Sequence, residues 1–261
     1  MEESRIKLPL TLEMIEFWEN EYLENIFHSL ELDKQKMLEG FATKEEIRED
    51  WEQYLGQETS DFAVGSERIF YWLFNQFGQP NSSPIGSDMF FETYNAYVHI
   101  DIKTVTLSNL GDITNSIFVG NNQNSYRGSI DLKNGESRPY EGNLPTFYTK
   151  KNGQKKVCLT YFICILYDEK DLSIQTIVLL SMPNGELNNV YGNRPLQSGK
   201  NPGKVRYRYS QCEKFELLED KNRIKVLLWN KNMDSNVKKR LKTITNLVEQ
   251  DEIIMTKSDI Y

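Results

Sequence analysis

The sequence predicts one α/β domain in which helices flank a central mixed β-sheet. Apolar side chains recur with a helical period over residues 11–57. Short apolar or alternating segments, typical of strands, follow between residues 87 and 229. A last amphipathic segment again has a helical period. We therefore expect a single domain, 1–261, with a helical part over 1–80, a core over 81–230 and a C-terminal helix over 231–261.

Three helices are expected before the first strand. The first run is amphipathic from Leu12 to Phe27. A second, from Thr43 to Leu55, opens with the capping-box pattern Thr43-x-x-Glu46. A third extends from about Ser60 to Phe77 and ends at a Gly- and Pro-containing segment.

The strands predicted after these helices differ in character. A β-hairpin is expected over 87–105, and residues 107–156 are expected to be a long irregular excursion, either functional or disordered. The remaining expected strands are Val157 to Tyr167, Ser173 to Met182, Val205 to Tyr209 and Ile224 to Trp229. One amphipathic helix from about Ser235 to Gln250 is expected to complete the domain.

Composition excludes several classes of protein. The chain has 261 residues, of which 39% are apolar and 26% charged, as in ordinary globular domains. No apolar run approaches the ~18 residues of a membrane span, and the charged N-terminus is unlike a signal peptide. The 3 cysteines lack C-x-x-C spacing and indicate reduced thiols in a cytosolic protein. With only 2 histidines, zinc sites and histidine-based triads are disfavoured.

Three charged residues converge where the pattern predicts the hairpin. Alternation along the expected strand puts Asp101 and Lys103 on one face, about 7 Å apart. A turn near residues 94–96 brings Asp88 beside them. Two carboxylates and a lysine suit a hard divalent cation such as Mg²⁺ held next to a phosphate. The alternative is a solvated face or a surface ion pair.

The distribution of charge points to a polyanion. The net charge of −7 by itself argues against nucleic-acid binding. However, the segment from Leu187 to Cys212 contains no acidic residue and carries several basic ones, namely Arg194, Lys200, Lys204, Arg206 and Arg208. Such a local basic surface fits DNA even on an acidic protein.

The strand from Val205 to Tyr209 is the candidate for reading bases. Arg206 and Arg208 are expected to share one face, beside Lys204, and arginine bonds guanine bidentately. The alternative is an edge strand protected by charge against aggregation. Next to the acid-free segment and an upstream metal site, DNA is the favoured interpretation.

Together these features resemble the PD-(D/E)XK nucleases, and within them the type II restriction endonucleases of the BglI and SfiI branch. The similar segments occur in the same order over about residues 60–212, and they are 63–66, 98–105, 120–123, 182–185, 198–200 and 205–208. The family's first aspartate follows a proline, whereas Ser87 precedes Asp88 here, and the spacing to the D-x-K motif is shorter. Glu92 on the same strand is the fallback ligand.

The resemblance implies a restriction-endonuclease-like fold and Mg²⁺-dependent hydrolysis of DNA, with Mn²⁺ expected to substitute. It implies Asp88, Asp101 and Lys103 as catalytic residues. The implied metal ligands are Asp88, Asp101, the carbonyl of Ile102 and, as a supplement, Asp61, with Glu67 a weaker candidate. The implied DNA-binding residues are Lys200, Lys204, Arg206, Arg208, Asn122 and Gln123. The Asn121–Asn124 loop is alternatively a turn-rich connector.

The resemblance also implies partners. We expect double-stranded DNA with a short palindromic or interrupted palindromic, G·C-containing site, no membrane, and a homodimer, with a tetramer as the alternative, in the bacterial cytoplasm. The N-terminal helices are candidates for the dimer surface or for core packing. Three rival interpretations are a repair or structure-selective nuclease, a non-catalytic DNA-binding relative, and an unrelated α/β protein.

Overall fold

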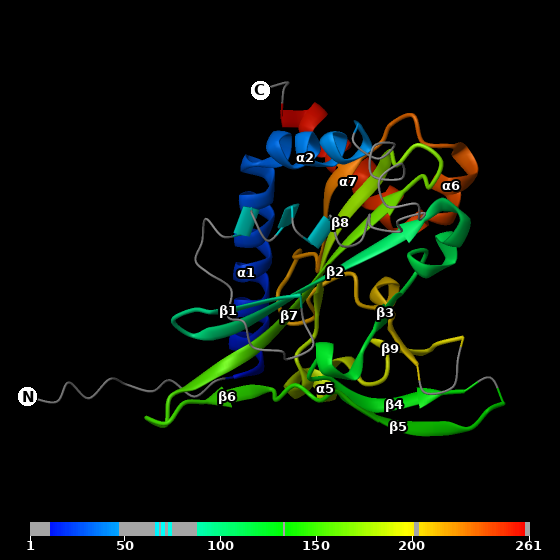
Figure 1. The fold of residues 1–261 in the computed structure, drawn as a ribbon. Coiled ribbons are helices and arrows are strands. Elements are labelled where there is room, and N and C mark those ends of the chain that lie inside the picture. The colour runs from blue at the N-terminus through cyan, green and yellow to red at the C-terminus, as the bar shows by residue number, and fades with distance from the viewer. Residues whose placement is uncertain are drawn as a thin grey trace, which may run out of the picture.

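The computed structural model describes residues 11–46, 66–67, 69–70, 73–74, 88–132, 134–200 and 204–258. Its centre is a six-stranded sheet with the order β1-β2-β7-β8-β11, in which β6 also pairs with β7 (Figure 1). The strands are β1 (Met89–Glu92), β2 (Ala96–Thr106), β6 (Phe147–Thr149), β7 (Lys155–Tyr167), β8 (Ile174–Met182) and β11 (Ile224–Trp229). Because β2 and β7 are parallel and the other pairs antiparallel, the sheet is mixed, which confirms the predicted fold class.

The sheet is covered on both faces, as the burial and contacts of its strand β7 show. Apart from its ends, β7 is buried along its whole length, as expected of a strand that faces apolar layers on both sides. On one face, the Tyr161 hydroxyl donates to Glu19 O of helix α1 (Leu12–Leu32) at 2.8 Å. On the other, the Phe162 ring lies 6.5 Å from the Tyr207 ring of a second, smaller sheet. The core is therefore a three-layer stack centred on β7.

The helical layer is formed by α1 (Leu12–Leu32) and α2 (Lys34–Glu46). Thr11 caps α1, since its Oγ1 accepts from Met14 N at 3.2 Å. The apolar face of α1, including Leu23 and Leu30, is buried, so this helix packs in the core. A helix beginning at Thr43 is wrong: α2 begins at Lys34 and continues through Thr43.

The third expected helix is described only in part. Residues 66–67, 69–70 and 73–74 are helical, and the remainder of Ser60 to Phe77 lies outside the described residues. Phe70 and Leu73 are buried, as the predicted apolar face requires. None of the helices in the described part of the chain combines the length and apolarity that crossing a bilayer requires.

A buried ionic network fastens α1 to the sheet. The Arg223 guanidinium, fully enclosed before β11, donates to Glu19 Oε2 at 2.7 Å and Glu16 Oε1 at 3.2 Å. The Asn184 N–H donates to Glu19 Oε1 at 2.6 Å. Buried charges need such pairing, because each one has lost its water. The network fixes the position of α1 against β8 and β11.

The predicted irregular excursion over 107–156 is wrong, because the structure forms strands there. A second sheet has the order β3-β10-β9, and a separate ribbon pairs β4 with β5. The strands are β3 (Ile117–Val119), β4 (Arg127–Asp131), β5 (Ser137–Glu141), β9 (Leu196–Ser198) and β10 (Val205–Tyr207). The ribbon buries only Ile130 and Tyr140 from its two strands, which is why apolar alternation did not reveal it.

Short 3₁₀ turns and three further α-helices complete the described part of the fold. They are the 3₁₀ turns η1 (Leu107–Asp112), η2 (Asn121–Gln123), η3 (Gly185–Leu187) and η4 (Tyr209–Gln211), and the helices α5 (Asn188–Tyr191), α6 (Ser235–Arg240) and α7 (Lys242–Ser258). The single C-terminal helix predicted from Ser235 to Gln250 is two helices, because the backbone breaks at Leu241.

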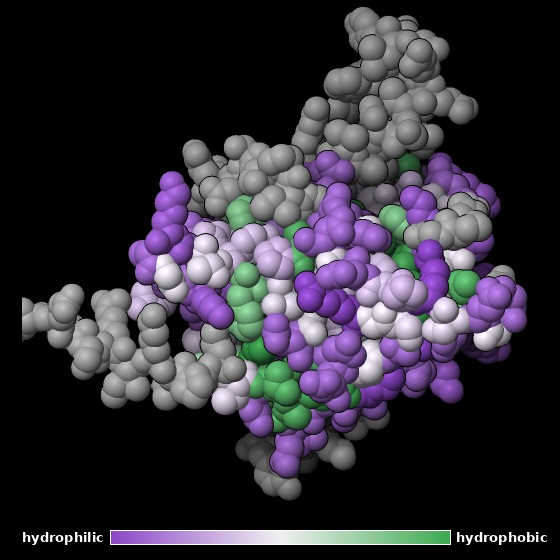
Figure 2. Space-filling view, turned by 90° about the horizontal axis from the view of Figure 1, so that it is seen from below, coloured by the Kyte–Doolittle hydropathy of each residue, from purple (hydrophilic) through white to green (hydrophobic). Residues whose placement is uncertain are grey.

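The β4–β5 ribbon lies at the opposite end of the molecule from α2 and α7 (Figure 1). Seen from below, the described surface is mostly hydrophilic, with hydrophobic residues in small groups (Figure 2).

Candidate active site

The predicted hairpin brings Asp88 next to the D-x-K motif. Strands β1 and β2 pair antiparallel with Met89 opposite Ile100, and Asp88 directly precedes β1. The Asp88 Oδ2 atom accepts a hydrogen bond from Ile102 N at 2.6 Å. This bond holds the Asp88 carboxylate beside the residue that separates Asp101 from Lys103.

Asp101 and Lys103 form an ion pair on one face of β2. The Lys103 ammonium contacts Asp101 Oδ2 directly, and the two side chains are 18% and 4% exposed. Burial raises the pKa of Asp101 to about 7, an effect that Lys103 opposes and that the nearby negative charge of Asp88 reinforces. The carboxylate is thus costly to ionise until a cation approaches it.

Glu67 adds a third carboxylate to this region. Partial burial and the negative charge of Asp88 raise the pKa of Glu67, while Lys103 lowers it. The side chain is exposed, as expected of a helix face, yet its charge interacts with both residues. Asp61, which the sequence suggested as a supplementary ligand, lies outside the described residues.

Gln123, expected on the DNA-binding surface, lies against the Asp101–Lys103 pair. Its Nε2 donates to Asp101 Oδ1 at 2.7 Å, and its Oε1 accepts from Lys103 Nζ at 3.2 Å. The same Oε1 accepts from Gly120 N at 2.7 Å, which ties the side chain to the η2 turn. Asn122, its neighbour, is exposed and bonded to Asn143.

The oxygen atoms at the site fit a hard divalent cation. Asp101 presents two oxygen atoms, Oδ2 in contact with the Lys103 ammonium and Oδ1 bonded by Gln123. Asp88 is exposed on the same side, so a cation could reach both carboxylates. Among the described residues, no group of three or more His, Cys, Asp or Glu side chains is arranged to hold a metal. A pair of carboxylates is what Mg²⁺ usually takes from a protein, completing its shell with water and phosphate oxygens.

Glu92, the alternative to Asp88 suggested by the sequence, forms ion pairs away from the Asp101–Lys103 pair. It lies at the turn end of the hairpin, opposite Tyr97. Its carboxylate pairs with Lys150 and, at 2.7 Å, with Lys156. The hydrogen bonds from Lys150 and Lys156 lower the pKa of Glu92 to about 2. Asp88, and not Glu92, is therefore the carboxylate that accompanies Asp101.

Lys204 and Lys200 belong to the predicted DNA surface, and they differ in position. Lys204 lies near the Asp101–Lys103 pair, whereas Lys200 lies on the exposed surface. The Lys204 Nζ lies 5.4 Å from the centroid of the Phe118 ring, and Lys103 Nζ lies 5.9 Å from the same ring. Phe118 is 39% exposed on β3. Lys200 is exposed in the turn that follows β9. On β3, Phe118 lies between the buried residues Ile117 and Val119, so the alternation of the strand places its ring on the exposed face.

The two arginines of the basic strand have different environments. Strand β10 ends at Tyr207, so Arg208 lies beyond it, and the predicted five-residue strand is too long. Arg206 is held inside the protein by four hydrogen bonds, to Asp112 Oδ1 and O and to Ser116 Oγ and O. Arg208 makes one, from Nε to Arg194 O at 3.2 Å. Arg206 in this arrangement stabilises the loop that precedes β3, whereas Arg208 is available to a ligand.

Two family models match the chain. One, described as the N-terminal domain of the type II restriction enzyme MwoI, matches residues 11–171. The other, described as the central domain of the same enzyme, matches residues 174–229. No curated protein matches the chain.

Two solved structures share the fold. Tetrameric restriction endonuclease SfiI bound to cognate DNA has a TM-score of 0.59 and 16% identity, over 86% of this chain and 88% of that one. Restriction endonuclease BglI bound to its DNA recognition sequence has a TM-score of 0.51 and 18% identity, over 82% of this chain and 96% of that one. At these identities the likeness shows a common fold.

Proposed function

The chain belongs to the MwoI family of type II restriction enzymes, DNA-cleaving hydrolases, and we propose that it hydrolyses double-stranded DNA at a short palindromic or interrupted site through Asp88, Asp101 and Lys103. The observation that carries this proposal is the meeting of these three side chains on β1 and β2. Asp88 bonds the Ile102 N–H, and Lys103 contacts the buried Asp101 carboxylate. The neighbouring Glu67 adds negative charge.

Mg²⁺ is the proposed cofactor, held by Asp88, Asp101 and the Ile102 carbonyl, with Asp61 as a further proposed ligand and Mn²⁺ as a substitute. When bound, such an ion polarises the phosphate and stabilises the leaving oxygen. The exposed Asp88 carboxylate, held beside Ile102 and next to Asp101, supports this assignment, because oxygen ligands suit a hard cation. The side chain of Gln123 keeps the Asp101 carboxylate oriented by bonding its other oxygen.

Lys103 is proposed to act on the substrate phosphate. Its ammonium is largely enclosed between Asp101, Gln123 and the rings of Phe118 and Phe162. There it can donate to a non-bridging phosphate oxygen and offset the charge that develops in the transition state. Removal of the lysine should therefore abolish cleavage without preventing DNA binding.

Recognition is proposed to come from the basic surface beside this cluster. Lys204 lies against the same Phe118 ring as Lys103, while Lys200, Arg208 and Asn122 have surface positions. Arginine and lysine favour guanine, so G·C pairs are expected in the site. A base-reading role for Arg206 would require it to leave Asp112 and Ser116. We further propose that the enzyme acts as a homodimer, or a tetramer of two dimers, in the bacterial cytoplasm.

The test is incubation with bacteriophage DNA of known sequence, in millimolar Mg²⁺ or in EDTA. Wild type is compared with Lys103→Ala and with Lys239→Ala, a matched control at an exposed position of α6. Discrete bands that need Mg²⁺ and Lys103, and that persist in the control variant, are expected. A smear that needs both would instead favour a structure-selective nuclease, and intact DNA in every lane would remove the catalytic assignment.

A further inference from the structure

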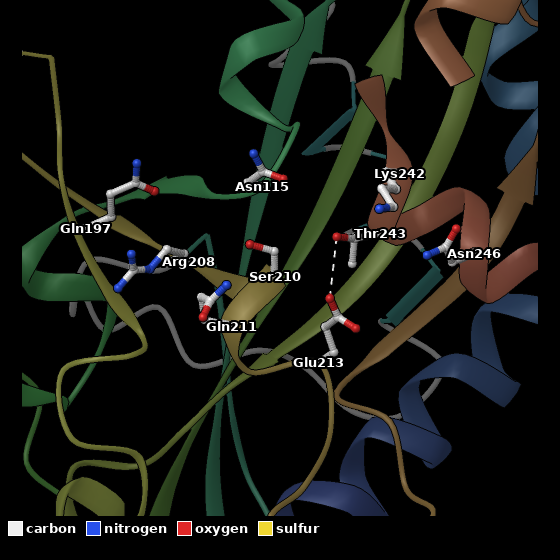
Figure 3. Close-up of a pocket in the computed structure, with 9 residues that line it drawn as sticks. All are labelled: Asn115, Gln197, Arg208, Ser210, Gln211, Glu213, Lys242, Thr243 and Asn246. Carbon is white, nitrogen blue, oxygen red and sulfur yellow. Dashed lines mark hydrogen bonds between the residues drawn. The ribbon is translucent and has the colours of Figure 1, made fainter. Parts of the chain in front are cut away.

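A polar cleft of about 500 Å³ lies beside the second sheet, at its junction with α7 (Figure 3). One wall carries Gln197 from β9 and Arg208 after β10, and the other carries Lys242 and Asn246 from α7. Glu213 lies between these two groups, with its carboxylate 3.5 Å from Thr243 Oγ1. The cleft thus joins the basic surface to a helix that carries no residue of the proposed recognition set.

Several groups in the cleft have bonding capacity left for a ligand. Gln197 Oε1 is enclosed, yet it accepts no hydrogen bond across the described ranges of the chain. An enclosed polar atom without a partner is costly, so its retention points to a partner that arrives from outside. Lys242 and Asn246 are both exposed, and their spacing of four residues places them on one face of α7.

The mixture of charges identifies the kind of group that fits. Arg208 and Lys242 donate hydrogen bonds, whereas the Glu213 carboxylate and Gln197 Oε1 accept them. A phosphate only accepts, and Glu213 would repel it. Base edges in the major groove present donors and acceptors together. The lining therefore suits base edges better than the DNA backbone.

The cleft is also at a suitable distance from the catalytic cluster. Arg208 follows Lys204 by four residues, about 13 Å of extended chain, and Lys204 shares the Phe118 ring with Lys103. Since stacked base pairs are about 3.4 Å apart, the stretch from Lys204 to Arg208 spans at most about four base pairs. One duplex could contact both places at once.

We propose that this cleft is a second base-reading site, in which Glu213 accepts from the amino group of a cytosine and Asn246 pairs with an adenine. Both pairings follow the hydrogen-bonding pattern of base edges in the major groove. The inference rests on the proposed DNA cleavage and extends recognition from the basic strand to the start of α7. It assigns to Glu213 a contact with a base, because a carboxylate repels the phosphates of the DNA backbone.

The test compares Glu213→Gln and Asn246→Ala with Asn236→Ala, a matched amide at an exposed position of α6. Binding is measured in Ca²⁺, which is expected to support binding without cleavage, to duplexes that carry the sequence that wild-type protein selects from a random pool, with each base pair substituted in turn. Each cleft variant is expected to lose discrimination of about tenfold at one base pair and to keep it elsewhere. Asn236→Ala should match wild type at every position.

Two results would overturn the proposal. A uniform loss of affinity for all duplexes would show a backbone contact or a folding defect, which the melting temperature of each variant separates. Unchanged discrimination at every position would show that the cleft does not contact bases. Binding and cleavage are tested separately. Wild-type protein that binds its site in Ca²⁺ but does not cut it in Mg²⁺ would contradict the proposed hydrolysis, and the binding data would still test whether the cleft contacts bases.

Discussion

Asp101 is a carboxylate that the fold keeps from water and surrounds with charge. Its side chain is 4% exposed, with Lys103 in contact and Asp88 close enough to raise its pKa. One of its oxygens accepts a hydrogen bond from Gln123, and the other contacts the Lys103 ammonium. In this state the site favours the arrival of a cation that neutralises the two carboxylates.

The affinity for Mg²⁺ should therefore depend on pH. With the pKa of Asp101 raised to about 7, the metal-free protein holds a proton there below pH 7, which Mg²⁺ must displace. Affinity should fall about tenfold per pH unit as the pH drops below 7, and become level above it. The Mg²⁺-induced rise in melting temperature, measured at several concentrations between pH 5.5 and 8.5, gives the constants. An affinity independent of pH would show that Asp101 is not a ligand.

Gln123 is expected to act on catalysis through its two neighbours. Gln123→Ala removes the bonds to Asp101 and Lys103, so the turnover of bound DNA should fall about 10- to 100-fold. Asn122→Ala, one residue away, is expected to change the affinity for DNA instead. Single-turnover cleavage at saturating enzyme separates the two effects. Equal loss of DNA affinity in both variants, with turnover unchanged, would show that Gln123 contributes to DNA binding and not to catalysis.

The sequence predicted the local part of this site and missed the distant part. Asp101 and Lys103 share a face because strands alternate, and the hairpin register follows from a short turn. The contact of Gln123 with Asp101 joins residues 22 positions apart, through a 3₁₀ turn with no periodic signal. The sequence therefore identified Gln123 as polar and functional, but not where it points.

At the scale of elements, Arg206 connects β10 to the loop between η1 and β3. Its guanidinium bonds Asp112 and Ser116 through side-chain and main-chain atoms, and its side chain is 11% exposed. A basic residue on a strand can thus serve packing as well as recognition. A strand beginning at Val205 was correctly expected, but it ends at Tyr207, and only the fold shows that its arginine is used internally.

Arg206→Ala should reduce stability more than it reduces sequence discrimination. Loss of the guanidinium leaves the Asp112 and Ser116 acceptors unpaired, at a cost of about 1–3 kcal/mol in the free energy of unfolding. Urea unfolding measures this cost, with Arg240→Ala on α6 as an exposed control expected within about 0.5 kcal/mol of wild type. A variant of normal stability that no longer discriminates one G·C pair would make Arg206 a base reader.

Elements with strong apolar patterns were predictable and polar ones were not. Strands β7 and β8 are almost wholly buried, so their apolar runs marked them clearly. The β4–β5 ribbon is mostly exposed and polar, and its strands were read as irregular chain. The break at Leu241 also escaped prediction, since both helices continue one amphipathic pattern.

At the scale of the whole molecule, the N-terminal helix is joined to the sheet by charges that no local pattern reveals. Arg223 reaches Glu16 and Glu19, more than 200 positions earlier in the chain. The sequence showed acidic residues in an amphipathic helix and left open whether this helix packs in the core. The paired, enclosed charges show that α1 does so.

The oligomeric state provides a further test at this scale. A palindromic site read by a two-fold protein requires two chains, so the protein is expected to sediment as a dimer, or a tetramer, on its DNA. Analytical ultracentrifugation with duplexes of the cleaved sequence measures the stoichiometry. One chain per intact duplex site would contradict the proposed symmetric dimer.

The most direct test of the central claim is to sequence the ends of all DNA fragments that the enzyme produces. Site-specific hydrolysis through Asp88, Asp101 and Lys103 predicts one short sequence at every cut, one overhang, and no cuts by Asp101→Asn or Lys103→Ala. Ends without a common sequence, or cleavage that survives both substitutions, would contradict the account.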